Sequence, residues 1–431
     1  MKLAIVGAGW AGMAAAVSAT QLGHNATVFE ASHAIGGRAR ALNSSKICML
    51  PDGQSAQLDN GQHILIGAYS ATLDLLRQVG IDPDQALLKL PMTLQFPDGL
   101  GLRFLNLPTP FDAFFGIVSA RGWSLADKWS LLRASLSWQR KHFSCAANLS
   151  VSALCRGVSH KVMAELIEPL CVSALNTPPE RACAAVFLRV LRDALFTVQG
   201  GSQLLLPRTD LSSLFPTAAA HWLKQRGVQI RLAERVTSVH RLGEHWHVQA
   251  EPFDAVIIAI SASNAALALQ QWALEAPQSI ASKMHNWSSI SQALQHEAIA
   301  TVYAWGLNAR LAQPMLALHS SATAPAQFVF DRGQLGNPNG LLAFVVSAAN
   351  GTAASLQTQV LMQAKTQLGL ELQALQTVVE KRATFACTPG VQRPPLRIAP
   401  GLLACGDYVE GPYPATLEGA VRSGLAAVQA L

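Results

Sequence analysis

The chain has few charged residues, which narrows the kinds of partner it can have. Only 13% of its 431 residues are charged, whereas 50% are hydrophobic. The formal charge is +6, but the basic residues are scattered along the chain, so we expect no nucleic-acid partner. An apolar, mildly basic chain is compatible with docking on an anionic membrane surface or with an apolar substrate tunnel.

The sequence also lacks closely spaced cysteine pairs and long apolar runs. The seven cysteines are odd in number and form no Cys-x-x-Cys motif, so we expect reduced, mostly buried thiols in a cytoplasmic protein and no metal site. Beyond the N-terminal strand and helix, no run approaches about 18 apolar residues, which predicts that no helix spans a membrane. Repeats, low-complexity tracts and long linkers do not occur.

What the chain does have is a glycine-rich turn near its start. A short apolar strand at residues 3–6 runs into it, a helix follows to Leu22, and a second strand ends in an acid. Glycines at such a turn permit close approach to a pyrophosphate, the helix N-terminus attracts phosphate, and the acid binds a ribose. The residues predicted to bind a dinucleotide are Gly7, Gly9, Trp10, Ala11, Gly12 and Glu30. A signal peptide is the competing interpretation, which four glycines and the lack of a small-residue cleavage site disfavour.

The next residues indicate which dinucleotide binds. Gly36, Gly37 and Arg38 offer further backbone amides and a guanidinium for the pyrophosphate. The stretch from Glu30 to Arg40 resembles the second signature of FAD-containing amine oxidases, phytoene desaturases and protoporphyrinogen oxidases. This resemblance implies FAD rather than NAD, with Arg38 near the phosphates. It also implies an α/β fold in which a Rossmann-type FAD-binding domain is interleaved with a mixed α+β substrate domain.

The C-terminal segment agrees with this resemblance. A strand at residues 402–405 is followed by a Gly-Asp pair, and a last helix opens near Leu417. The resemblance implies that the Asp holds the ribityl chain or a phosphate, and that the helix dipole faces the pyrimidine end of the flavin. The residues carried over in this way are Gly406, Asp407, Glu418, Gly419 and Ala420. It further implies that the backbone at Val236 contacts adenine. Because no Cys motif of covalent flavinylation is present and Cys405 precedes the Gly-Asp pair, we expect non-covalent FAD.

The order of segments predicts how the two domains share the chain. We expect the FAD-binding domain to comprise residues 1–68, 196–265 and 386–431, and the substrate-binding domain residues 69–195 and 266–385. A helix is predicted near residues 211–225. Strands are predicted at 228–232, 236–240, 245–251, 253–260, 299–305, 327–330 and 342–347. A capping box at Ser124 and Asp127 opens a helix with an apolar stripe of Leu125, Trp129, Leu132 and Leu136.

A second resemblance concerns the substrate. Residues 59–69, together with 327–332 and 414–424, resemble hydroxysqualene dehydroxylases, the squalene-associated FAD-dependent proteins of bacterial hopanoid synthesis. The match runs across nearly the whole chain, with one departure at residues 411–413. It implies that hydroxysqualene and reduced FAD give squalene, water and oxidised FAD. The lack of aromatics at Ala415 and Thr416, where amine oxidases flank the amine, points away from amine oxidation, although Tyr413 could fill that place.

Loss of an allylic hydroxyl requires an acid and a pocket that excludes water. The candidate catalytic residues are His63, Asp59 and Tyr413. His63 as the acid is one hypothesis; the alternative is that its polar neighbours only shape the loop and His63 abuts the flavin. Asp331 and Arg332 are expected to form an internal ion pair that shapes the pocket.

A C30 isoprenoid is insoluble, so we expect substrate to come from a membrane, with the protein peripheral on its inner face and squalene-pathway enzymes as possible partners. A candidate interfacial patch comprises Phe111, Phe114, Phe115, Ile117, Val118 and Trp123, with Arg121 and Lys128; the alternative is that these residues form the core of the substrate domain. Two other functions stay open. One is a FAD-dependent desaturase or oxidase of another isoprenoid or an amine, and the other is a non-catalytic flavin-binding carrier of prenyl intermediates.

Overall fold

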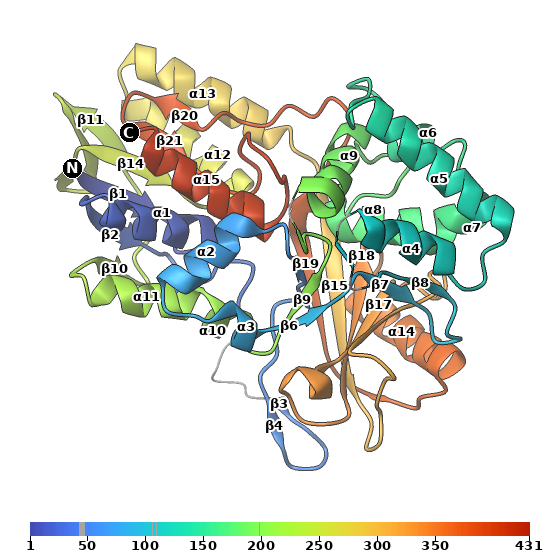
Figure 1. The fold of residues 1–431 in the computed structure, drawn as a ribbon. Coiled ribbons are helices and arrows are strands. Elements are labelled where there is room, and N and C mark those ends of the chain that lie inside the picture. The colour runs from blue at the N-terminus through green and yellow to red at the C-terminus, as the bar shows by residue number, and fades with distance from the viewer. Residues whose placement is uncertain (43–47, 106, 109, 198) are drawn as a thin grey trace.

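The computed structural model describes residues 1–42, 48–105, 107–108, 110–197 and 199–431. The chain is arranged around two large sheets (Figure 1), one of six strands and one of five. The six-stranded sheet takes strands from the beginning, the middle and the end of the chain. Among the described residues, no helix combines the length and the apolar character needed to cross a bilayer.

The six-stranded sheet has the order β10-β2-β1-β14-β21-β20 and is parallel except for β20. Its strands are β1 (Lys2–Val6), β2 (Asn25–Phe29), β10 (Gln229–Arg231), β14 (Ala255–Ile258), β20 (Arg397–Ala399) and β21 (Leu402–Ala404). Strands covered on both faces read as continuous apolar runs, as β14 and β21 do. Strand β1 lies between β2 and β14 and runs parallel to both. The glycine turn that follows β1 therefore lies at the carboxyl edge of the sheet, where open α/β sheets bind ligands.

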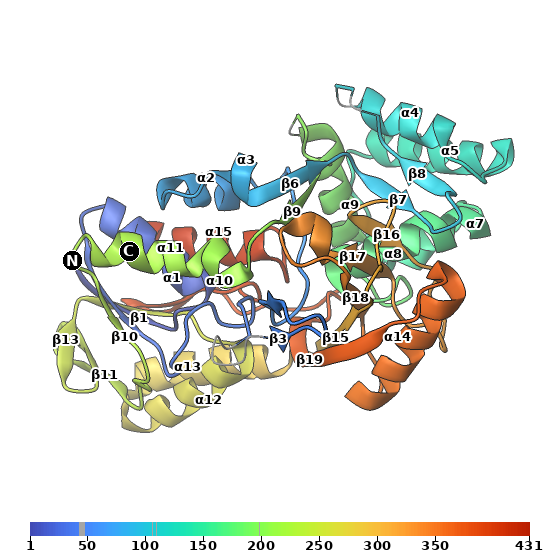
Figure 2. The same cartoon turned by 90° about the horizontal axis from the view of Figure 1, so that it is seen from below.

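Helices cover both faces of this sheet (Figure 2). On one side lie α1 (Trp10–Gln21), α2 (Ser70–Gln78), α3 (Pro83–Ala86), α10 (Leu211–Leu214), α11 (Pro216–Lys224) and α15 (Leu417–Gln429). On the other side lie α12 (Ala262–Trp272), the 3₁₀ turn η3 (Ala273–Glu275) and α13 (Gln278–Gln292), with a small sheet of β11 (Val239–Leu242), β12 (His245–Val248) and β13 (Glu251–Phe253). Small residues let α1 and α15 touch: a Cβ on Gly424 would lie 2.3 Å from the Ala11 oxygen.

The five-stranded sheet has the order β16-β17-β18-β15-β19 and is antiparallel. Its elements are β15 (His296–Trp305), β16 (Met315–Ala317), β17 (Phe328–Asp331), the 3₁₀ turn η4 (Arg332–Leu335), β18 (Leu341–Ser347), α14 (Ala353–Leu368) and β19 (Gln373–Phe385). Side chains alternate between its faces. Val329 and Phe344 pack in a core with α14, whereas Phe328, Phe330 and Val345 face the interior cavity described below.

A helical layer and three small sheets complete the structure. The helices are α4 (Phe111–Ser119), α5 (Leu125–Arg140), α6 (Val151–Leu154), α7 (His160–Val162), α8 (Glu168–Leu175) and α9 (Ala184–Arg192), with π-helices η1 (Met163–Ile167) and η2 (Asp193–Thr197). The small sheets are β3 (Cys48–Met49) with β4 (Ser55–Ala56); β5 (Leu65–Ile66) and β6 (Leu87–Leu90) with β9 (Leu204–Pro207); and β7 (Thr93–Gln95) with β8 (Gly101–Arg103).

Several sequence-based boundaries were wrong. The helix expected near residues 211–225 is broken at Phe215, because Pro216 begins a new helix. The strand expected from Val236 begins only at Val239, so Val236 lies in a loop. The strand expected at 245–251 turns back after Val248, where Gln249 has a left-handed φ of 57°. The capping box at Ser124 and Asp127 is confirmed.

Candidate active site

One large cavity connects the two sheets. Its volume is about 1370 Å³, above the range of about 300–1,000 Å³ that is typical of small-molecule pockets. At one end it is lined by the glycine turn after β1 and by Glu30; at the other it is lined by apolar side chains of α4, α5, α9 and the five-stranded sheet. A single space of this size has room for a dinucleotide and an apolar ligand together.

The glycines of the turn divide into two kinds. Gly7 and Gly12 allow close packing, since a Cβ on Gly7 would lie 2.5 Å from the Ala259 oxygen and one on Gly12 would lie 1.9 Å from the Gly7 oxygen. Gly9 instead faces Gly37 across the cavity wall; a Cβ on Gly9 would be 3.8 Å from the Gly37 Cα. The absence of side chains on this pair leaves the first turn of α1 open to the cavity, where its backbone N–H groups have no partner within the helix.

Glu30 and Val236 line the same end of the cavity. The carboxylate of Glu30 accepts hydrogen bonds from the Ala8 and Ser32 backbone N–H groups, both at 2.8 Å. These bonds hold the acid beside the glycine turn, and its remaining lone pairs stay available to a ribose. Val236 lies in the loop before β11, between other lining residues. Trp10 also lines the cavity, and its indole N–H donates to the Ala39 oxygen at 2.9 Å.

Arg38 joins the second glycine motif to the C-terminal Gly-Asp pair. Its guanidinium forms an ion pair with Asp407 and also donates to the Ala383 oxygen at 2.6 Å. All three residues line the cavity. The backbone of Gly36 reaches back to the glycine turn, since its N–H donates to the Ala8 oxygen at 2.8 Å. Two motifs almost 370 residues apart in sequence therefore meet in one wall.

The start of α15 differs in part from the expectation. Ala420 lines the cavity, but Glu418 does not. The Glu418 carboxylate is fully buried and accepts hydrogen bonds from the backbone N–H groups of Ala71 and Thr72 and from Arg422. It thus ties α15 to the first turn of α2, a position that does not support cofactor contact. Gly419 is needed for packing, because a Cβ there would lie 2.1 Å from the Tyr413 oxygen.

His63 lies in the cavity wall in a form that accepts hydrogen bonds. Its Nδ1 lies 2.9 Å from the Gly61 carbonyl oxygen, which can only accept, so Nδ1 carries the proton and Nε2 has a free lone pair. Burial lowers the pKa of His63, and the charge of Arg38 lowers it further against the opposing effect of the Gly61 hydrogen bond. At neutral pH the ring is uncharged, which does not support the hypothesis that His63 is the acid.

Asp59 belongs to a buried cluster behind the cavity wall. One carboxylate oxygen accepts from the Leu211 N–H at 2.9 Å, and the other lies 3.5 Å from Nη2 of Arg332. Arg332 donates from Nη1 to the Gln62 side chain at 2.9 Å. Burial raises the pKa of Asp59 to about 6, while Arg332 opposes that rise. Asp59 does not line the cavity itself, but Arg332 links it to the side chain of Gln62, which does.

The prediction of an ion pair between Asp331 and Arg332 was wrong. Asp331 caps the turn η4 and accepts from the backbone N–H groups of Gly333 and Leu311 at 3.1 and 3.0 Å. Residues adjacent in sequence at the end of a strand point to opposite faces, so Arg332 meets Asp59 instead. The sequence contained both charges but no signal for their pairing, because the two residues lie 273 positions apart.

Tyr413 lines the cavity beside Tyr69, which sequence reasoning did not assign. Their ring centroids lie 6.2 Å apart, nearly perpendicular. Burial raises the pKa of Tyr413 to about 12, and a hydrogen bond to Asp193 also raises it. Tyr413 lies in the turn before α15 and has a left-handed φ of 57°. An aromatic pair is therefore present, although it is built from residues other than 415 and 416.

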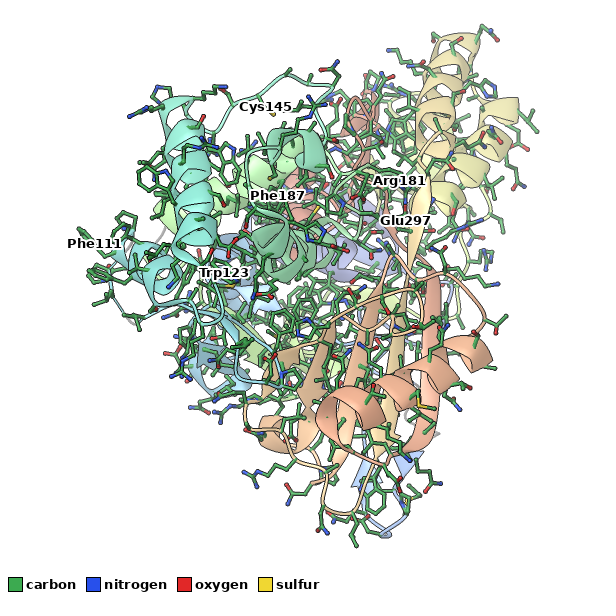
Figure 3. All side chains as sticks on the ribbon, turned by 90° about the vertical axis from the view of Figure 1, so that its right-hand side faces the viewer. Phe111, Trp123, Cys145, Arg181, Phe187 and Glu297 are labelled. Carbon is green, nitrogen blue, oxygen red and sulfur yellow. The ribbon has the colours of Figure 1, made fainter. Side chains whose placement is uncertain are left out.

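The apolar end of the cavity is built from helices that the sequence did not resolve. The two π-helices, η1 and η2, lie beside it and contribute Leu166, Ile167 and Leu195 to its lining. Such irregular turns change the direction of side chains and occur often at functional sites. Phe187 of α9 is buried among these helices (Figure 3) and also lines the cavity. Among the described residues, no three His, Cys, Asp or Glu side chains are grouped to hold a metal ion.

The predicted interfacial patch is only partly exposed. Phe111, Phe114, Phe115 and Val118 are exposed, but Ile117 and Trp123 are buried. The indole N–H of Trp123 donates to Glu165 at 2.7 Å, and its ring packs in the core. The assignment of Ile117 and Trp123 to the surface was therefore wrong: Ile117 lies on the inward side of α4, and Trp123, in the connection before α5, turns its ring into the core.

The geometry fits a flavin dinucleotide. The side-chain-free backbone at Gly9 and Gly37, the first turn of α1, Glu30 and Arg38 form a wall suited to an ADP group and its phosphates. The rest of the cavity continues into an apolar chamber. Together the parallel sheet, this wall and the chamber define a flavoprotein oxidoreductase of the dinucleotide-binding α/β class.

Comparison with known proteins agrees with this class. The sequence model of the family described as flavin-containing amine oxidoreductases matches residues 10–431. The chain belongs to this family and is a FAD-dependent oxidoreductase.

Individual relatives and a solved structure add detail. The chain is similar to the hydroxysqualene dehydroxylase of Zymomonas mobilis, with 27% identity over 97% of this chain and 96% of the relative. It is also similar to the hydroxysqualene dehydroxylase of Sinorhizobium fredii, with 24% identity over 97% and 95%. The crystal structure of an oxidoreductase from Methanosarcina mazei covers 100% of both chains with a TM-score of 0.72 and 16% identity, which shows the shared fold.

Proposed function

We propose that the protein catalyses the FAD-dependent reductive dehydroxylation of hydroxysqualene to squalene, in squalene and hopanoid biosynthesis. The observation that carries this proposal is the single cavity in which an apolar chamber continues from the dinucleotide wall. A C30 hydrocarbon chain needs such a chamber, since each buried methylene contributes about 0.8 kcal/mol. The similarity to hydroxysqualene dehydroxylases over 97% of the chain supports the same substrate.

In the proposed reaction the allylic carbon–oxygen bond breaks, a carbon–hydrogen bond forms, and the hydroxyl takes a proton and leaves as water. Reduced FAD, when bound, supplies a hydride and is oxidised. The protein supplies orientation and a water-poor environment. Phe328, Phe330 and Val345 face the chamber from the sheet, and helices α5 and α9 cover it from the opposite side, so charge that develops on the substrate is kept away from bulk water.

We assign separate roles to the three candidate catalytic residues. His63 accepts a hydrogen bond from the substrate hydroxyl at its free Nε2 and so orients the alcohol. Tyr413 also lines the cavity, keeps its phenolic proton at neutral pH and is the proposed proton donor. Asp59 acts through Arg332 and Gln62 and is a positioning residue.

The remaining assignments stay proposals. We propose FAD-binding segments 1–68, 196–265 and 386–431, a substrate domain of 69–195 and 266–385, non-covalent FAD and a cytoplasmic location near squalene-pathway enzymes. Cys405 is buried and does not line the cavity, which supports non-covalent binding. Glu418 ties α2 to α15, so residues 70–78 of the proposed substrate domain pack directly on the FAD-binding domain.

A second candidate is an oxidase or desaturase that runs the flavin in the opposite direction. The observation that favours it is the pair of Tyr69 and Tyr413, which resembles the two aromatics that flank an amine. Anaerobic flavin spectroscopy of the holoprotein separates the two functions. With reduced protein, we expect hydroxysqualene to restore the oxidised flavin spectrum and to yield squalene on extraction. Bleaching of oxidised protein by squalene or by amines would instead support the oxidase, and no spectral change with either would support a carrier.

A further inference from the structure

Exposed apolar side chains are concentrated on one part of the surface. The described residues include nineteen exposed large hydrophobic side chains, and nine of them lie between positions 105 and 136. The members of this group, which we call the α4–α5 face, are Leu105, Leu107, Phe111, Phe114, Phe115, Val118, Leu125, Trp129 and Leu136. Figure 3 shows Phe111 at the outer edge of the molecule, with Trp123 closer to its body. Exposed apolar side chains gathered on neighbouring elements in this way are typical of interaction sites.

Helix α5 has a second apolar side, which does not pack against the rest of the described structure. Its buried residues are Leu131 and Trp138, which face the protein interior. At 100° per residue, Leu125, Trp129 and Leu136 fall within about 40° of one another on a different side of the helix. Leu125 and Trp129 are 85% and 64% exposed, respectively. This outward stripe is therefore unpartnered in the described structure and available to a ligand surface.

The surface around the stripe is basic. Between positions 100 and 145 the chain has six Lys or Arg and two acids, and one of these acids, Asp112, is buried. Arg133 and Arg140 flank the stripe on α5, and Arg121 precedes the helix; all three are exposed. Such a surface is complementary to anionic lipid headgroups, which attract basic residues close to the bilayer.

The cavity opens at the same face. Phe111, Phe114, Phe115 and Leu136 are each exposed and at the same time line the cavity. The rim of the chamber is therefore made of side chains that can lie in hydrocarbon. A ligand leaving a bilayer at this rim would pass into the chamber without crossing water.

We propose that the α4–α5 face docks on the surface of an anionic phospholipid bilayer and admits the apolar substrate directly from it. This inference rests on the proposed function for the identity of the substrate, but docking itself does not. Helix α4 lies at the interface with its aromatic rings among the acyl chains, and the Arg residues of α5 contact the headgroups.

Flotation of the FAD-bound protein with vesicles tests the docking. The probes are phosphatidylcholine vesicles with and without phosphatidylglycerol. We expect the protein to float with the anionic vesicles and to be released from them by salt. A protein that stays at the bottom of the gradient with both vesicles overturns the proposal.

A double variant, Leu125→Glu with Trp129→Glu, identifies the face, since neither residue lines the cavity. Its matched control is Leu274→Glu with Leu307→Glu, two exposed leucines outside the face. We expect the partition coefficient to fall about tenfold or more in the first variant, because two apolar side chains that would be buried among the lipids are replaced by charged ones. The control should change it less than about twofold. Equal binding by both variants, or a dimer in sedimentation velocity that only the first variant dissociates, overturns the proposal.

Turnover separates docking from the proposed chemistry. With hydroxysqualene in detergent micelles, the Leu125→Glu and Trp129→Glu double variant should turn over like the wild type. With hydroxysqualene in vesicles, its rate should fall in proportion to its binding. If no form of the protein converts hydroxysqualene, the proposed function fails, while flotation still decides the docking.

Discussion

Replacing Arg332 with Met should destabilise the protein far more than the same replacement at a surface arginine. The Arg332 side chain is only 1% exposed and faces the Asp59 carboxylate, which is 2% exposed. Removing the guanidinium leaves the buried Asp59 carboxylate with a hydrogen bond from the Leu211 N–H but without its ion-pair partner, and it takes a donor from Gln62. Breaking a buried ion pair in this way costs about 3–5 kcal/mol.

The expected change in melting temperature follows from the size of the chain. At about 2.1 cal/mol/K per residue, the unfolding entropy is about 900 cal/mol/K, so 1 kcal/mol corresponds to about 1 °C. Arg332→Met should therefore lower Tm by about 3–5 °C. Arg181 provides the matched control, since it pairs with Glu297 at 2.6 Å but is 55% exposed (Figure 3). Arg181→Met should lower Tm by about 1 °C or less, because exposed pairs contribute about 0–1 kcal/mol.

The assay is thermal unfolding followed by circular dichroism at saturating FAD. The pH dependence adds a second check. The folded-state pKa of Asp59 is raised to about 6, so the stability associated with its protonated form is present at low pH and is lost as pH rises through about 6. Without Arg332 this pKa rises further, and the Tm difference between wild type and Arg332→Met should widen from pH 5 to pH 8. A Tm loss no larger than that of Arg181→Met, or a difference that narrows with pH, would refute the reasoning.

Three further changes test other parts of the site. Gly12→Ala should prevent recovery of yellow holoprotein, because the added Cβ would lie 1.9 Å from the Gly7 oxygen; a stable protein with the normal flavin absorbance would contradict this. His63→Gln should make Tm fall less steeply on acidification than in the wild type. Burial lowers the pKa of His63, so the stability that comes from its neutral form is lost as pH falls through that pKa. Identical Tm profiles from pH 5 to 8 would argue against a buried neutral ring. Glu30→Gln should weaken FAD binding by about tenfold in a fluorescence titration of the apoprotein, since hydrogen bonds to a charged group are worth about 1.5–3 kcal/mol. An unchanged affinity for FAD would place the ribose elsewhere.

Much of the cofactor end could be predicted because its signals are local. The turn at Gly7, Gly9 and Gly12 lies within one strand–helix unit, so the spacing of the glycines alone reveals it, whereas the close contacts of Gly7 and Gly9 with Ala259 and Gly37 come from other segments. The same holds for the capping box at Ser124 and Asp127, which closes within one helical turn. Resemblance extended these local signals to FAD and to the family.

The catalytic end could not be predicted in the same way, since its contacts join distant segments. Charge adjacency implied a pair of Asp331 with Arg332, but the sheet turned Arg332 toward Asp59. Glu418 sits within a cofactor motif and yet its carboxylate caps α2. The protonation state of His63 depends on its burial and on the Gly61 carbonyl, neither of which is visible in the residue type.

The sequence by itself therefore determined the dinucleotide wall and the apolar, weakly charged character of the chain, because backbone conformation and composition are properties of neighbouring residues. Only the tertiary structure decided which charged groups are buried together and which face of α5 meets solvent. It also showed that the exposed aromatics of α4 form the rim of the chamber. Burial and pairing arise from segments hundreds of residues apart, and their energies depend on that proximity rather than on order along the chain.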